Sequence, residues 1–247
     1  MRVDQLLVER GLATSRSQAQ RLIASGVRWR DRGDWKAVVK NGDEVSADAE
    51  IELLDDAEAR YVSRGGLKLE GALKASGIDV TGKLCLDVGQ STGGFTDCLL
   101  RQGARHVVGV DVGQGQLHDN IRSDERVTAI EKVNARELSG EDAGDDPFDL
   151  VVGDLSFISS TLVLPALVPL MAQGGELLFL VKPQFELQPG QVGKGGIVTD
   201  KALYDFVKQR VADCCASLGL QVKAWHESPI AGGDGNREFF VHATKND

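Results

Sequence analysis

The segment 84–99, LCLDVGQSTGGFTDCL, constrains the fold of this chain more than any other stretch. A short apolar run ends at Asp87, a turn containing Gly89, Gly93 and Gly94 follows, and a helix is predicted after the turn. Glycines permit a sharp turn and let the backbone approach a ligand closely. A strand, a glycine turn and a helix N-terminus together present backbone N–H groups and a positive dipole end. This corner predicts a site for a nucleotide-like cofactor.

A second apolar run, 106–110, ends at Asp111, which lies 22 residues beyond Gly89. An acidic residue at about 20 residues' offset meets ribose hydroxyls in nucleotide-binding α/β folds. The glycine pattern is D-x-G-x-x-x-G-G, whereas a dinucleotide site has G-x-G-x-x-G. This spacing favours S-adenosylmethionine (SAM) over a nicotinamide cofactor. A glycine turn with a purely structural role is the alternative.

Length and charge indicate a large domain joined to a small one. The chain has 247 residues, 42% of them hydrophobic, which is enough for a sizeable core. Its net charge of −9 excludes a generic polyanion binder. Residues 1–40 nevertheless hold nine Lys and Arg against four Asp and Glu, whereas residues 41–58 hold eight acids and no base. The first segment could bind phosphate, and the second would repel it.

Cysteine, histidine and hydropathy patterns predict neither a metal site nor a membrane span. The four cysteines and four histidines show no ligand spacing. We therefore expect reduced thiols in a cytoplasmic protein. The longest apolar stretch, 162–172, is interrupted by Pro165 and Pro169, and no secretion signal opens the sequence.

Two structural blocks follow from the periodicity. In residues 1–59 the pattern predicts two helices, one at 3–9 and one after an N-cap at Ser15, followed by three short strands. Residues 60–64 read as a linker. From residue 65 onward, strands alternate with helices, which indicates a doubly wound, mostly parallel sheet with its last strand antiparallel. The expected elements of this block are strands at 84–87, 106–110, 127–130, 148–152, 176–181, 220–226 and 238–243, with helices that include 67–75, 159–171 and 200–217.

Charged residues follow two of the predicted strands. Asp154 comes just after the strand at 148–152 and Lys182 just after that at 176–181. Open α/β sheets bind ligands along this carboxyl edge. If Lys68 and Glu238 joined them, two lysines and two acids could remove a proton from an alcohol. Taken singly, each could equally be an ordinary surface charge, and the sequence alone does not show that they converge.

The first block, VDQLLVERGLATSRSQAQRLIASGVRW, resembles the S4 RNA-binding domain. Together with this block, six later segments make the chain similar to the TlyA family of ribosomal RNA 2′-O-methyltransferases, which are also called haemolysins. These segments are DVGQSTGGFTD, GVDVGQGQL, VVGDLSFIS, LVKPQFE, VGKGGIVTD and SPIAGGDGNREFF. The departures are Gln90, Gln114 and the loop RDRGDWKAVVKNGDEV.

The resemblance implies a Rossmann-like class I SAM-dependent methyltransferase of the FtsJ type over residues 65–247, with an α+β S4 domain over residues 1–59. It implies a catalytic tetrad of Lys68, Asp154, Lys182 and Glu238. The expected SAM-binding residues are Asp87, Gly89, Ser91, Gly93, Gly94, Phe95, Thr96, Asp111, Asn134 and Asp154, and the expected RNA-binding residues are Arg2, Arg16, Arg21 and Arg28. Asn134 could contact adenine or simply form a turn.

The implied reaction is methylation of a ribose 2′-oxygen in ribosomal RNA, with cytidines of 16S and/or 23S rRNA as the expected targets. Lys182 would align or deprotonate the hydroxyl, and ribosomal subunits would be the partners, without a metal or a membrane. Three alternatives stay open at this point: a membrane-lytic protein, a non-catalytic RNA-binding assembly factor and a nicotinamide oxidoreductase.

Overall fold

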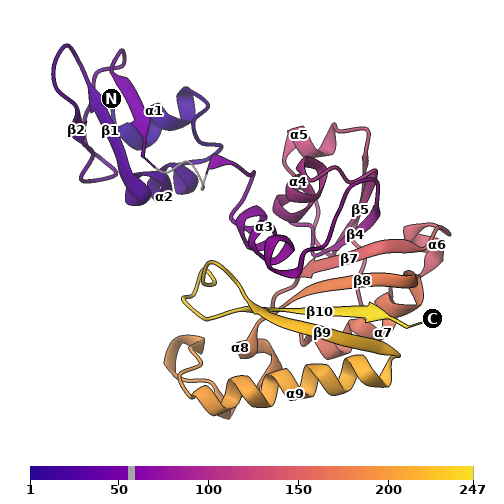
Figure 1. The fold of residues 1–247 in the computed structure, drawn as a ribbon. Helices are drawn as coiled ribbons and strands as arrows, with labels where there is room; N and C mark the ends of the chain where they lie inside the picture. The colour runs from indigo at the N-terminus through magenta and orange to yellow at the C-terminus, as the bar shows by residue number, and fades with distance from the viewer. Residues whose placement is uncertain (55–58, 247) are drawn as a thin grey trace. The chain divides into compact units, whose positions relative to one another are not determined.

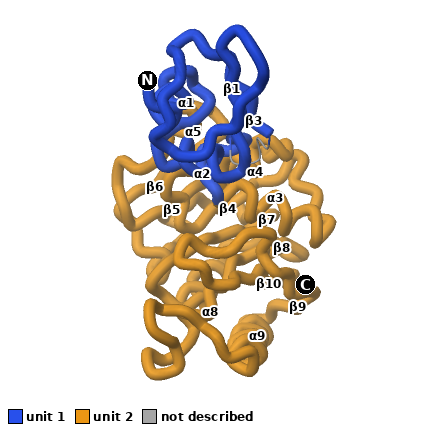
Figure 2. Tube along the Cα trace, turned by 90° about the vertical axis from the view of Figure 1, so that its left-hand side faces the viewer, with its two compact units in different colours: residues 1–64 blue, residues 65–247 orange. Residues whose placement is uncertain are grey.

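The computed structural model describes residues 1–54 and 59–246 and divides the chain into two units, residues 1–64 and 65–247 (Figure 2). The structure groups residues 60–64, the predicted linker, with the first unit. The end of the acidic segment, residues 55–58, lies outside the described residues. The boundaries of an S4 domain at 1–59 and a linker at 60–64 stay a prediction.

The first unit contains two helices and a three-stranded antiparallel sheet of order β2-β1-β3. These elements are α1 (Val3–Glu9), α2 (Arg16–Gly26), β1 (Val27–Arg30), β2 (Lys36–Ala37) and β3 (Glu50–Leu53). The predicted N-cap is confirmed, since Ser15 Oγ accepts a hydrogen bond from the Gln18 backbone N–H at 3.2 Å. The helices bury Leu6, Leu7 and Leu22 in one core, as amphipathic helices do.

The second unit is built on a seven-stranded sheet of order β6-β5-β4-β7-β8-β10-β9 (Figure 1). Its strands are β4 (Leu84–Val88), β5 (His106–Asp111), β6 (Val127–Glu131), β7 (Phe148–Asp154), β8 (Met171–Val181), β9 (Leu220–Glu227) and β10 (Phe239–Lys245). The pairs among β4 to β8 are parallel, and β10 is antiparallel to both β8 and β9. The predicted doubly wound sheet with an antiparallel last strand is confirmed.

Helices cover both faces of this sheet. They are α3 (Gly65–Ser76), α4 (Gly94–Arg101), α5 (Asp119–Arg122), α6 (Gly140–Ala143), α7 (Leu164–Leu167), α8 (Pro183–Glu186) and α9 (Lys201–Ser217). Because side chains alternate along a strand, β10 contacts both layers. Phe240 stacks on Phe95 of α4, whereas Val241 shares a core with Val207 and Val211 of α9.

The helix predicted over 159–171 is wrong. The structure has instead two short 3₁₀ turns, η2 (Ser160–Leu162) and η3 (Val168–Leu170), on either side of α7, and β8 begins at Met171. Pro165 and Pro169 occupy the first turns of α7 and η3. Proline has no N–H to donate and is tolerated only in the first turn of a helix, so the apolar segment cannot form one long helix.

The predicted glycine loop at 188–196 contains two more 3₁₀ turns, η4 (Pro189–Gln191) and η5 (Lys194–Gly196). Among the described residues, no helix has the length and apolar character needed to cross a membrane. Across residues 1–54 and 59–246, no group of three or more His, Cys, Asp or Glu side chains is arranged to hold a metal ion.

Candidate active site

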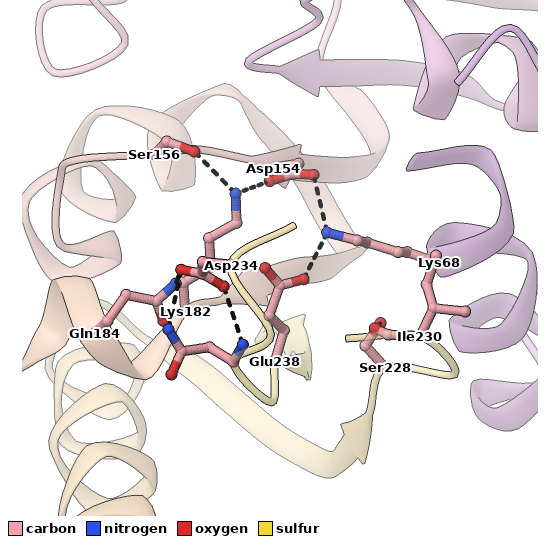
Figure 3. Close-up of polar contacts among 10 residues, drawn as sticks. Lys68, Asp154, Ser156, Lys182, Gln184, Ser228, Ile230, Asp234 and Glu238 are labelled. Carbon is pink, nitrogen blue, oxygen red and sulfur yellow. Dashed lines mark hydrogen bonds and ion pairs between the residues drawn. The ribbon is translucent and has the colours of Figure 1, made fainter. Parts of the chain in front are cut away.

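Four charged side chains, distant in sequence, meet beyond the carboxyl ends of β7 and β8 (Figure 3). Lys68 Nζ donates a hydrogen bond to Glu238 Oε2 at 2.6 Å and lies 3.9 Å from Asp154 Oδ2. Lys182 Nζ lies 2.5 Å from Asp154 Oδ1 and donates to Ser156 Oγ at 3.0 Å. The Lys182–Asp154 contact is an ion pair without hydrogen-bond alignment. The structure thus brings the four predicted tetrad residues into one chain of charges.

Four separate elements position this tetrad. Asp154 is the last residue of β7 and pairs in register with Leu180 of β8. Lys182 therefore emerges beside Asp154, and Pro183 begins α8 directly after it. Lys68 lies on α3, and Glu238 immediately precedes β10. The antiparallel strand is thus what carries an acid from the end of the sequence back to the carboxyl edge.

The tetrad is largely shielded from solvent. The side chains of Lys68, Lys182, Glu238 and Asp154 are 9%, 10%, 3% and 22% exposed. Buried charges are costly unless they are paired, and here two ammonium groups alternate with two carboxylates. The arrangement fixes the Lys182 ammonium in place while leaving Asp154 the most accessible member.

A cavity of about 210 Å³ lies along the ends of the neighbouring strands. Its lining includes Gly89, Asp111 and Asn134 from the predicted SAM-binding set, and Ser156 beside Lys182. The carboxylate of Asp111 is held by backbone N–H groups of Ser91 and Gly113, each at 2.7 Å. Asn134 forms the predicted turn, since its Oδ1 accepts from the Arg136 N–H at 3.1 Å, and it also faces this cavity.

The sequence interpretation missed most of the apolar lining of the cavity. These residues are Val110, Val112, Val133, Ala135, Leu155 and Ile158. All of them lie at or just beyond the carboxyl ends of β5, β6 and β7. In the sequence, only their position at or just after the end of a predicted strand could have identified these residues, because apolar residues there form no recognisable motif.

Three other predicted cofactor residues are buried beneath the glycine turn and contact its neighbouring elements. Thr96 Oγ1 donates to Asp87 Oδ2 at 2.7 Å and accepts from Gln90 Nε2 at 2.9 Å, with all three residues buried. Phe95 packs against Phe240, with ring centroids 6.0 Å apart. Among the described residues, none of Asp87, Phe95 and Thr96 lines the 210 Å³ cavity.

At two glycines of the turn, neighbouring protein atoms leave no room for a side chain. Gly89 has φ +84°, and a Cβ there would lie 2.5 Å from the Asp154 carbonyl oxygen. Gly93 has φ +95°, and a Cβ would lie 2.8 Å from Leu117. The helix α4 begins at Gly94, which is buried. Contacts within the protein thus account for Gly89 and Gly93, and the close approach of Gly93 and Gly94 to a ligand stays a prediction.

Burial raises the pKa of Asp87 to about 7, against the hydrogen bond from Thr96 that lowers it. Its Oδ1 is buried and has no hydrogen-bond partner among the described residues. Because the pKa of this carboxyl group is higher in the folded than in the unfolded chain, its contribution to the free energy of unfolding is largest below the unfolded pKa, near 3.8. That contribution is lost as the pH rises from there to about 7.

We expect Asp87→Asn to remove this loss. Between pH 4 and 7, the free energy of unfolding of the variant should rise relative to that of the parent chain, by a few kcal/mol at most. Urea denaturation at several pH values, without SAM, measures the difference. Asp124→Asn is the control, because Arg126 lowers the pKa of Asp124 below 3.8. The difference in unfolding free energy between this variant and the parent chain should therefore not change with pH above about pH 5. A flat difference for Asp87→Asn as well would contradict the prediction.

Three of the four arginines predicted to bind RNA form ion pairs within the first unit. Arg2 and Arg16 both contact Asp4 at 2.9 Å, and Arg28 pairs with Glu52. The hydrogen bond from Arg2 is the main cause that keeps the pKa of Asp4 far below its usual range. Arg21 is half-buried on α2 and donates to its own helix at Ser17 O.

The Arg28 pair is more exposed than the two pairs made by Asp4. Both members of the Arg28–Glu52 pair are about 40% exposed, and exposed ion pairs contribute little free energy, so a phosphate could replace Glu52. Asp4 is fully buried, so loss of Arg2 and Arg16 to a phosphate would leave its charge unpaired. The loop that departs from the S4 pattern adds Trp35, whose ring lies 4.9 Å from the Arg28 guanidinium and 4.8 Å from that of Arg30. Sequence reasoning had not connected Trp35 with these arginines, because the contacts depend on the pairing of β1 with β2.

The sheet order, the glycine corner and the tetrad define a class I SAM-dependent methyltransferase fold. The FtsJ-like methyltransferase family matches residues 61–245, and the S4 domain matches residues 1–26. The chain belongs to the TlyA family: it is 48% identical to the 16S/23S rRNA (cytidine-2′-O)-methyltransferase TlyA of Mycobacterium tuberculosis, over 97% of this chain and 88% of that protein.

Two further relatives carry the name hemolysin. Hemolysin A of Brachyspira hyodysenteriae is 38% identical over 98% of this chain and 99% of its own length. A solved structure of a hemolysin-named protein from Streptococcus thermophilus is 40% identical, covers 100% of this chain and 89% of its own, and superposes with a TM-score of 0.78. The family thus bears both an enzymatic and a lytic name.

Proposed function

We propose that this chain transfers a methyl group from SAM to the 2′-oxygen of a cytidine in 16S and/or 23S ribosomal RNA. The observation that carries the proposal is the convergence of Lys68, Asp154, Lys182 and Glu238 at the carboxyl edge of the sheet, beside the 210 Å³ cavity. The substrate class comes from the similarity to the mycobacterial rRNA (cytidine-2′-O)-methyltransferase. An RNA substrate also agrees with the S4 match at residues 1–26.

The residues around the cavity fit SAM. Asp111 offers carboxylate oxygens that its backbone donors already orient, as a ribose diol requires. The apolar Val112, Val133 and Ile158 suit an adenine ring. Asp87 does not line the cavity, so its unpartnered Oδ1 would meet the amino group of SAM through water. Bound SAM supplies an electrophilic methyl group on a positively charged sulfur.

The remaining chemistry falls to this chain's own residues. The Lys182 side-chain nitrogen, held by Asp154 and Ser156, is placed to contact the 2′-hydroxyl, which it would align as an ammonium or deprotonate as a neutral amine. Lys68 and Glu238 hold Asp154 from the other side, so that the Lys182 Nζ position is fixed before the substrate arrives. Much of the acceleration would come from this positioning.

A second cavity, of about 570 Å³, would receive the target nucleotide. It is lined by Lys182 and Glu238 of the tetrad and by Phe157 and Phe185. Phe157 is 91% exposed, has φ +65° and lies 5.2 Å from the Phe185 ring, centroid to centroid. An exposed aromatic ring beside the reacting group offers a stacking surface for a nucleobase drawn out of folded RNA.

The test is transfer of labelled methyl from SAM to ribosomal subunits, followed by mapping of 2′-O-methyl groups on the rRNA. We expect incorporation at cytidine only, and none when the target carries 2′-deoxyribose. Label on a base, or on the 2′-deoxy substrate, would contradict the proposal. Leakage of liposomes caused by the same protein and unaffected by tetrad substitutions would favour the lytic alternative.

A further inference from the structure

One residue that lines the 570 Å³ cavity has a side-chain amide oxygen without a partner among the described residues. Gln184, the second residue of α8, lines this cavity together with Lys182. Its Nε2 donates a hydrogen bond to Asp234 Oδ2 at 3.0 Å. Its Oε1 is shielded from solvent and accepts no hydrogen bond from any described residue. A buried acceptor without a donor costs free energy, so this atom is suited to a donor on a bound molecule.

The orientation of the Gln184 amide is determined by its neighbour. A carboxylate only accepts hydrogen bonds, so the nitrogen must face Asp234 and the oxygen must face away from it. Asp234 is itself held, because its Oδ1 accepts from the Asn236 N–H at 3.0 Å and its Oδ2 from Asn236 Nδ2 at 2.9 Å.

Asn236 makes this support rigid. It is buried, and its side chain also contacts the glycine loop, donating to Gly196 O at 2.9 Å and accepting from the Val198 N–H at 2.9 Å. Gln184 thus presents an acceptor of fixed direction.

We propose that Gln184 Oε1 accepts a hydrogen bond from the exocyclic amino group of the target base and so selects cytidine over uridine. This inference rests on the proposed function. Cytosine carries an N4 amino donor where uracil carries the O4 acceptor. With uridine in the site, two acceptors would face each other and Gln184 Oε1 would stay unpaired, which is the situation that sites built around a hydrogen bond reject most strongly.

The positions of the neighbouring groups suit this reading. Lys182 and Gln184 flank Pro183 and line the same cavity, so a nucleoside with its ribose at Lys182 extends its base toward Gln184. Figure 3 shows Gln184 and Asp234 on the Lys182 side of the tetrad, with Lys68 on the opposite side. Phe157, stacked on the base, would fix the plane in which Gln184 meets its edge.

The experiment compares initial rates of methylation on subunits assembled with cytidine or with uridine at the target position. The parent chain should prefer cytidine by about 10- to 100-fold. Gln184→Met keeps the side-chain length but removes the acceptor, and should bring the ratio to within about 3-fold through a loss on cytidine. The control is Gln209→Met, because Gln209 donates to Asp213 at 2.7 Å in an exposed pair on α9 and should keep the parent ratio.

The outcomes separate the inference from the function on which it rests. If the parent chain methylates neither substrate, the proposed function fails. If Gln184→Met slows both substrates equally and the ratio persists, Gln184 is only structural and the inference is overturned. If Gln184→Met does not fold, Asp234→Asn replaces it, because the amide introduced by that substitution can donate to Gln184 Oε1 and occupy it. A ratio unchanged in that variant also overturns the inference.

Discussion

Replacing Lys182 with Ala should abolish methyl transfer to ribosomal RNA while leaving SAM affinity within about twofold of the parent value. The Lys182 ammonium contacts Asp154 and Ser156 and lines the cavity proposed for the nucleotide, whereas among the described residues the cofactor cavity lacks it. A positioned acid–base group contributes about 10²- to 10⁴-fold to rate, so we expect a loss of at least 10²-fold. Single-turnover transfer of labelled methyl, with calorimetry for SAM, measures the two quantities.

Lys83→Ala is the matched control for Lys182→Ala. Lys83 is also paired with a carboxylate, Glu176, at 2.9 Å, but it precedes β4 and so lies at the opposite end of the parallel strands. This variant should retain the parent rate. Full transfer by Lys182→Ala, or an equal loss in Lys83→Ala, would remove Lys182 from the proposed mechanism.

Local sequence patterns predicted the corner and the sheet because both depend on neighbouring residues. The run ending at Asp87, the glycine turn and the helix after it are set by backbone conformation within a short segment, and they form as expected. The same reasoning failed at 159–171, where apolar periodicity favoured a helix and Pro165 and Pro169 prevented it. Steric exclusion by proline outweighs hydrophobic pattern in such a segment.

The pairings inside the site could not be derived locally. Lys68 and Glu238 are 170 residues apart, and their 2.6 Å contact depends on β10 inserting between β8 and β9. Family resemblance named the tetrad, but periodicity and composition did not. Gln184 went unnoticed for the same reason, since an amide shortly after a strand carries no signal of its own until Asp234, from another loop, fixes its direction.

The arginines of the first unit show a different limit. Sequence reasoning counted Arg2, Arg16 and Arg28 as positive charges available to RNA, yet each has an acidic partner in the fold. The charge count of residues 1–40 therefore overstates the free positive charge of this unit. A role in RNA binding stays a prediction, and it is best tested by removing the S4-like segment as a whole.

Deleting residues 1–59 should preserve SAM binding within about threefold and reduce methylation of ribosomal subunits by more than about 100-fold. The apolar core formed by Leu86, Phe179 and Val241 lies entirely within residues 65–247, so the sheet retains its packing. The tetrad and the 210 Å³ cavity also belong to that unit. The deletion removes the nine Lys and Arg of residues 1–40 together with the acidic residues of 41–58. Contacts of basic side chains to phosphate supply much of the affinity for RNA.

The cut after residue 59 keeps residues 60–64, because the FtsJ-like match begins at residue 61. Thermal denaturation with and without SAM should show a single transition that the cofactor raises, which establishes that the shortened chain is folded. Subunit binding at several salt concentrations should then show a weaker salt dependence than that of the full chain, because fewer phosphates are neutralised. If the shortened chain methylates subunits at the full rate with an unchanged salt dependence, the second unit alone recognises the RNA, and residues 1–59 have another role.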